Sequence, residues 1–270
     1  MRLEYINSNG KSVDLTQYDT KIYQGNFHSF AWDYNGIEQQ YGVILQNFKK
    51  SPLIYEMQVA FRKEPEKNLN LFFETAETDI INKSPGKLYW NEHYLECFII
   101  EQSTVPSDDF FGAIRTCQIF APYPFWVKEE TKSFTTESIG TSDFLDYNYG
   151  YNYDYSVSDV GSIIWATGHY APSNFRLVIF GPVINPQIVI DGSIYQVLDT
   201  IDTNDYIIID NRANTIIKYL NNGTQQNRFD YRNKDSNIFK PIPGGNVTIN
   251  WNGDFGFDLT LFFERSEPAW

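Results

Sequence analysis

Cysteine and histidine are scarce in this sequence of 270 residues, which contains two cysteines and three histidines. Two cysteines allow at most one disulfide, so a small fold held together by several disulfides is excluded. Cys97 and Cys117 form no C-x-x-C pair, which excludes a cysteine-ligated zinc site and a thioredoxin-type redox motif. Both lie in strand-like segments, and we expect them to be reduced thiols in a core.

Long apolar runs and an excess of positive charge are also missing. No segment reaches the roughly 18 consecutive apolar residues of a membrane helix. Residues 1–10 lack the apolar stretch of a secretory signal, so we expect a protein made in the cytoplasm. The net charge is −13, and nucleic-acid affinity depends on cations that neutralise phosphate. We therefore expect neither specific nucleic-acid binding nor membrane association.

Catalytic signatures are absent as well. The sequence has no G-x-S-x-G, no Walker loop and no G-x-G-x-x-G, and His28, His93 and His169 have no partner at metal-ligand spacing. A Ser-His-Asp triad or a pair of glycosidase carboxylates can be assembled from distant positions, so the sequence leaves both open. Nothing points to either, and we expect no enzyme activity, no catalytic residues, no metal and no cofactor.

Aromatic and β-branched residues dominate what is present. Aromatic residues make up 17% of the chain, and the turn-rich spacing of the apolar segments predicts a mainly β fold. The expected strands are 41–46, 53–61, 94–100, 113–120, 175–180, 187–190, 206–209, 215–219, 247–251 and 255–263. Asp191-Gly192 and Asn252-Gly253 lie between expected strands and predict tight hairpins, the second with its aromatic residues packed inward.

One segment, 64–81, has the period of a helix. Its apolar residues recur at spacings of three and four and predict one stripe that covers a core: Leu69, Phe72, Phe73, Ala76 and Ile80. Pro65 suits its first turn, and Pro85-Gly86 follows its end. Two prolines in 122–126 interrupt a central strand, so we place a domain boundary after residue 127, with 128–132 as an exposed connection. The expected domains are 1–127 and 128–270.

The most unusual segment is 147–155, in which every second residue is tyrosine: Tyr147, Tyr149, Tyr151, Tyr153 and Tyr155. In an extended strand all five rings lie on one face. Three interpretations remain open. The strip packs against a core or a neighbouring subunit, it forms a platform on which sugars stack, or its Asp and Asn residues form a calcium loop. We take it as a candidate interface or ligand strip.

Several short stretches, in the same order, resemble the distal tail proteins of long-tailed, siphovirus-type phages. In the last third these are NFRL from Asn174, FGP from Phe180, IPGG from Ile242 and WNGDFGFD from Trp251. GKLY from Gly86 and PYPFW from Pro122 extend the resemblance into the first half. The tyrosine-rich segment stands where related proteins carry a similar stretch.

This resemblance implies an N-terminal β-rich, ring-forming domain with one helix and a C-terminal galectin-like β-sandwich. It implies a structural baseplate hub protein that forms a homo-oligomer, a hexameric ring, at the distal end of the tail tube. The partners would be the tail tube protein, tail tip or tail-associated lysin proteins and receptor-binding proteins. The chain would be made in a bacterial host cytoplasm, from a phage or a prophage, and end in the virion.

Two other functions stay open. The first is a carbohydrate-binding module that uses the strip 147–155. The sequence lacks the H-x-N-x-R pattern with which galectins bind sugar, so the galectin-like fold itself does not support it. The second is a cell-wall hydrolase, for which the sequence offers no residues.

Overall fold

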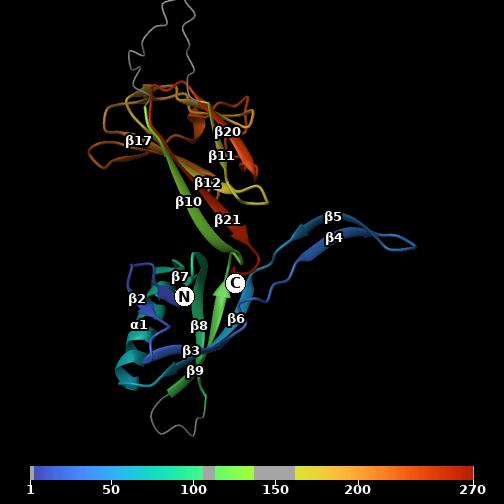
Figure 1. Ribbon diagram of the computed structural model, residues 1–270, viewed down its shortest axis with the longest axis vertical. Helices are drawn as coiled ribbons and strands as arrows, with labels where there is room; N and C mark the ends of the chain where they lie inside the picture. Colours follow the sequence, from blue (N-terminus) through green and yellow to red (C-terminus); the bar gives the residue numbers. More distant parts are fainter. Residues whose placement is uncertain (1–2, 106–112, 137–161, 270) are drawn as a thin grey trace, which may run out of the picture. The chain divides into compact units, whose positions relative to one another are not determined.

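The computed structural model describes residues 3–105, 113–136 and 162–269. Within these ranges the chain is mainly β, with a single α-helix, as expected (Figure 1). It divides into two compact units. Unit 1 comprises Met1–Lys128 and Glu264–Trp270, and unit 2 comprises Glu129–Phe263. The C-terminal segment therefore belongs to unit 1 by its contacts, whereas the division made from sequence assigned all of 128–270 to the second domain.

Unit 1 contains two antiparallel sheets that share one long strand. Its strands are β1 (Leu3–Ile6), β2 (Ser12–Asp14), β3 (Thr20–Gly25), β4 (Asp33–Glu38), β5 (Val43–Lys49), β6 (Leu53–Phe61), β7 (Gly86–Trp90), β8 (His93–Val105) and β9 (Ala113–Ala121). The first part of β8 pairs with β7 and the second with β9, giving the orders β2–β1–β7–β8 and β3–β6–β9–β8. Tyr55, Phe61 and Trp126 are fully buried in the core between them.

The helix α1 (Pro65–Asn82) confirms the segment expected from sequence, with Pro65 in its first turn. It ends where Lys83 adopts a left-handed conformation with φ 53°. Two residues later Pro85 precedes β7, and proline disfavours helical backbone in the residue before it.

The face that α1 buries differs from the predicted stripe. Phe72 and Ala76 are buried, but Phe73 and Ile80 are 45% and 44% exposed. The buried arc instead includes the carboxylate of Asp79, which binds groups of the N-terminal segment. With Asp79 on the buried face, part of the apolar stripe faces solvent in the isolated chain.

Unit 2 is a sandwich of two antiparallel sheets. Its strands are β10 (Trp126–Phe134, which begins in unit 1), β11 (Ser162–Ala166), β12 (Asn174–Phe180), β13 (Val183–Ile184), β14 (Gln187–Ile190), β15 (Ser193–Gln196), β16 (Thr200–Ile201), β17 (Tyr206–Asp210), β18 (Thr215–Tyr219), β19 (Gln225–Asn227), β20 (Asn246–Trp251) and β21 (Phe257–Arg265, which ends in unit 1). One sheet has the order β19–β18–β17–β12–β21–β10 and the other β11–β20–β14–β15.

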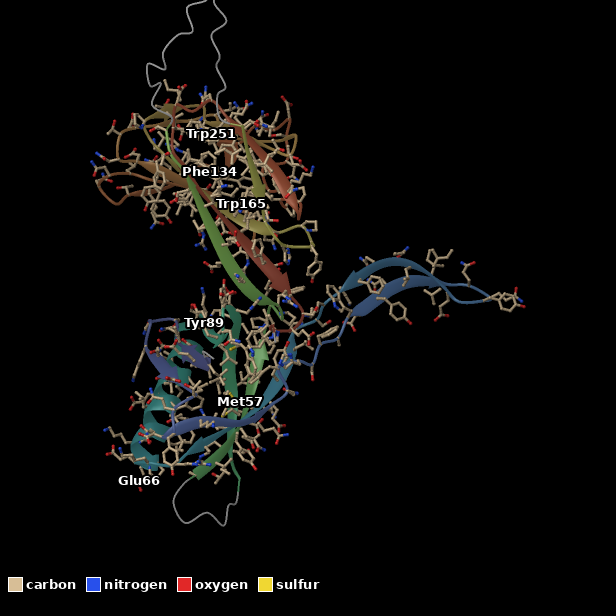
Figure 2. All side chains as sticks on the ribbon, in the orientation of Figure 1. Met57, Glu66, Tyr89, Phe134, Trp165 and Trp251 are labelled. Carbon is tan, nitrogen blue, oxygen red and sulfur yellow. The ribbon has the colours of Figure 1, made fainter. Side chains whose placement is uncertain are left out.

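Alternate residues of both sheets point into one core. Figure 2 shows Phe134, Trp165 and Trp251 gathered there. The Phe134 and Phe257 rings are stacked with their centroids 4.4 Å apart, and Trp251 meets both edge-on. Such aromatic pairs add to the stabilisation that burial of the rings supplies.

The two turn dipeptides have different outcomes. Asp191 and Gly192 both have positive φ and join β14 to β15 in a two-residue hairpin, as predicted. The hairpin predicted at Asn252-Gly253 is wrong, because β20 and β21 belong to opposite sheets and the segment crosses between them. The inward packing expected there is correct, since Phe255 and Phe257 are buried.

The charged stretch 128–132 is not an exposed connection but the middle of β10. Its residues alternate between exposed and half-buried, which is the period of a strand. The hydroxyl of Thr131 lies 2.8 Å from that of Thr260 in β21 and forms a hydrogen bond with it. Pairing within the sheet therefore makes this segment a strand although its polar composition favours a loop.

Candidate assembly interface

The strands β4 and β5 form a separate two-stranded hairpin, which we call the arm (residues 33–49). They pair with each other and with no other strand of the described chain (Figure 1). Every residue of both strands is exposed. Isolated two-stranded hairpins are marginally stable in water, so the arm lacks the cover that a stable sheet needs.

The composition of the arm is that of a buried sheet rather than a solvated one. Its charged residues are Asp33, Glu38 and Lys49. Its strands expose six large apolar side chains: Tyr34, Ile37, Val43, Ile44, Leu45 and Phe48. Exposed strands in soluble proteins are protected by charge, and contiguous exposed apolar patches mark sites of association. The arm is therefore the strongest candidate interface within the described residues.

The free energy gained by burying these side chains is large enough to contribute to assembly. Each is about half exposed, and full burial of such a side chain contributes about 1.5–3 kcal/mol, so covering the remaining half contributes about 1 kcal/mol each. Six of them supply about 6 kcal/mol, of the same order as the lower estimates of the cost of association. One arm alone gives a weak contact, whereas a closed ring makes the contact repeatedly.

The base of the arm is fixed by an aromatic box around Lys50, the residue that follows β5. Its Nζ lies 4.3 Å from the ring centroid of Phe125, 5.7 Å from that of Trp32 and 6.0 Å from that of Phe30. This ammonium is buried and has no hydrogen-bond acceptor among the described residues. Burial lowers the pKa of Lys50 to about 8, while the ring faces favour its charged form.

The box links the arm to the segment with two prolines that precedes β10. The Trp32 and Phe125 rings meet edge-on, with centroids 5.9 Å apart, and Tyr123 packs against Phe125 at 5.0 Å. These contacts hold both ends of the hairpin, since Trp32 precedes β4 and Lys50 follows β5. An arm held at its base loses less conformational entropy when it binds.

The described residues bring no metal-binding cluster together. No group of three or more His, Cys, Asp or Glu side chains within them has the spacing to hold a metal ion. His28 lies 3.4 Å from Glu267, and His93 and His169 are buried in different units. Across the same ranges, no helix is both long and apolar enough to cross a membrane.

The candidate strip Tyr147, Tyr149, Tyr151, Tyr153 and Tyr155 lies outside the described residues, and its role stays a prediction. The arm, in contrast, was not singled out from sequence. Residues 41–46 were expected to form an ordinary strand, and β5 does include most of them. The signal that could have found the arm is the combination of apolar strands with only three charges in a chain of net charge −13.

Among the solved structures that match this chain, three do so over nearly its whole length. The first is the crystal structure of the Dit protein (gp 19.1) of phage SPP1, described as a paradigm of the hub adsorption apparatus in phages that infect Gram-positive bacteria. It is 11% identical, covers 98% of each chain and has a TM-score of 0.62.

The other two matches come from the phage p2 baseplate in its activated conformation. The strontium-containing structure is 11% identical, with a TM-score of 0.64, and the calcium-containing structure is 12% identical, with a TM-score of 0.63. Both cover 99% of this chain and 100% of the matched chain. No family model matches the sequence, and no curated protein does. The chain therefore has the fold of the phage distal tail and baseplate hub proteins, as the resemblance in its sequence implied.

Proposed function

We propose that this protein is a structural hub of a phage tail, which forms a hexameric ring at the distal end of the tail tube. The observation that carries the proposal is the match of the fold over 98% of the chain to SPP1 Dit, a hub protein of an adsorption apparatus. The arm supports it, because a ring needs a surface with which one copy contacts the next.

In this proposal the function lies in assembly rather than in a reaction. One side of the ring docks on the tail tube protein. The other side carries the tail tip or tail-associated lysin proteins and the receptor-binding proteins. The chain is made in the cytoplasm of the bacterial host and becomes part of the virion. The exposed apolar residues of unit 1 fit this role, since they are concentrated in the arm and its surroundings.

The test is the absolute mass of the purified full-length chain, measured by light scattering over a concentration series. A species near six times 31.4 kDa, seen as closed rings by negative-stain electron microscopy, would support the proposal. A chain that stays monomeric at every concentration and forms no rings would contradict it. Hydrolysis of purified peptidoglycan by the isolated chain would contradict the purely structural role.

A further inference from the structure

We propose that a basic hollow between β3 and β6 binds an acidic segment of a partner protein. The hollow has a volume of about 190 Å³ and is lined by Lys21, Ile22, Tyr23, Ala60 and Arg62. This volume is many times the space that one water molecule needs. No residue of the arm lines it, so the hollow is a separate surface of unit 1 and does not depend on the proposed ring.

The pairing of β3 with β6 builds the hollow. Lys21 lies opposite Ala60 in the register of the two strands. Side chains alternate along β6, and Val59 and Phe61 are fully buried in the core of unit 1, so Ala60 points to the other face. Because Ala60 is small, it leaves space between the longer side chains of Lys21 and Arg62.

The two cations of the hollow lack an anionic partner, although the chain has 34 acidic and 21 basic residues. Within the described ranges, neither Lys21 nor Arg62 forms an ion pair or a side-chain hydrogen bond. Like charges that line one hollow repel each other, and an incoming anion relieves that repulsion. Other basic residues of unit 1 do pair with a glutamate: Lys11, Lys67 and Lys128.

Exposed tyrosines flank the two cations. Tyr18 and Tyr23 are 70% and 67% exposed. The guanidinium carbon of Arg62 lies 5.3 Å from the ring centroid of Tyr18. A guanidinium held against a ring loses less conformational entropy when its N–H groups bind a carboxylate. Tyrosine and arginine are also among the residues that most often dominate the energy of protein interfaces.

The chemistry of the hollow favours a short acidic segment of a protein over a nucleic acid. The fork of N–H donors of Arg62 matches a carboxylate, and Lys21 adds a second positive charge beside it. Nucleic acids bind through many phosphate contacts, whereas this hollow has two cations in a chain of net charge −13. Charge complementarity is therefore local, and it suits a few carboxylates with the tyrosine rings packed beside them.

The test follows methyl groups in the hollow by NMR while an acidic peptide is added to the full-length chain. Ile22 and Ala60 both line the hollow, and their methyl resonances can be followed in a monomer or in a large assembly. The probe is capped hexaglutamate, and capped hexaglutamine is its uncharged counterpart. Ile164, which is 69% exposed in β11 of unit 2, is the internal reference.

We expect hexaglutamate, but not hexaglutamine, to shift the resonances of Ile22 and Ala60 in a saturable way at low ionic strength. The resonance of Ile164 should not move. Binding should be lost at about 1 M salt, where the Debye length is only about 3 Å.

Three variants test the role of the cations. Arg62→Gln and Lys21→Gln should each weaken the binding of hexaglutamate by about fivefold, which corresponds to the loss of one exposed ion pair. Both side chains are exposed, so the variants should fold as wild type does. Lys234→Gln removes the same charge from an exposed lysine of unit 2 and should leave the affinity unchanged.

Four results would overturn the proposal. They are the absence of any shift with hexaglutamate, equal shifts with hexaglutamine, and binding that Arg62→Gln and Lys21→Gln do not weaken. The fourth is an equal response of Ile22 and Ala60 to inorganic phosphate, which would indicate a site for small anions. Shifts that appear on concentrating the chain without peptide, and that Arg62→Gln removes, would show that a second copy fills the hollow instead of a partner. All of these results leave the proposed ring untouched, since the mass of the assembly tests it separately.

Discussion

The hydrogen bond between Tyr5 and Asp79 should be a main support of unit 1. Both side chains are fully buried, and the hydroxyl Oη of Tyr5 donates to Oδ2 of Asp79 at 2.5 Å. The backbone N–H of Ser8 donates to the other carboxylate oxygen at 2.6 Å. A Cβ added at Gly86 would collide with both side chains, so the pair packs closely against β7.

We expect Tyr5→Phe to lower the free energy of unfolding of unit 1 by about 1.5–3 kcal/mol. Hydrogen bonds to charged groups are worth about this much, and the substitution leaves a carboxylate oxygen buried without its donor. For a unit of this size roughly 3 °C is lost per kcal/mol, so its melting temperature should fall by about 5–9 °C. Differential scanning calorimetry of the full chain measures this, with the transition of unit 2 as an internal reference.

The matched control is Tyr23→Phe, which removes the same hydroxyl from a tyrosine that is 67% exposed. It should change stability by less than about 0.5 kcal/mol, as surface substitutions do. If Tyr5→Phe proves as neutral as Tyr23→Phe, the buried pair does not hold β1 to α1 and the reasoning is refuted.

Three further predictions concern other buried groups. Lys218→Met should destabilise unit 2 by about 3–5 kcal/mol in calorimetry, because it leaves the buried carboxylate of Asp205, 3.6 Å from the ammonium, without its counter-ion; an unchanged transition would refute this. Burial lowers the folded pKa of Lys50 to about 8, so between pH 8 and 9.5 the unfolded state keeps a proton on this amine that the folded state has lost. The stability of wild type relative to Lys50→Met, measured by chemical denaturation at each pH, should therefore rise with pH over this range; a constant difference would refute this. Burial raises the pKa of the Cys117 thiol to about 12 and that of Cys97 further, so neither should react with maleimide at pH 7.5 until the chain unfolds.

Much of the fold could be predicted from sequence because its signals are local. All ten segments expected to be strands overlap strands of the structure, and Leu53–Phe61, Gln187–Ile190 and Thr215–Tyr219 agree to the residue. The helix followed from its period and from prolines at each end. These features depend on local backbone preferences and on the alternation of side chains, and both can be inferred from a short stretch of sequence.

Features that depend on tertiary partners were not predictable in the same way. The Asn252-Gly253 dipeptide indicates a turn, but not whether the next strand returns to the same sheet. The buried side of α1 is set by the pairing of Asp79 with Tyr5, which lies 74 residues away in the chain. The spacing of apolar residues along the sequence carries no information on such a contact. For this reason Phe73 and Ile80, two residues of the predicted stripe, are exposed rather than buried.

The arm is the clearest case of this limit. Apolar residues in a strand predict a covered sheet whether the cover comes from the same chain or from another. In Leu53–Phe61 the cover is intramolecular, whereas in the arm all residues remain exposed in the isolated chain. Whether an apolar strand is covered by its own chain or left exposed can therefore be decided only once the fold is known. The exposed apolar hairpin, held at its base by Lys50 and Phe125, is therefore the feature of the isolated chain that best fits the proposed role in assembly.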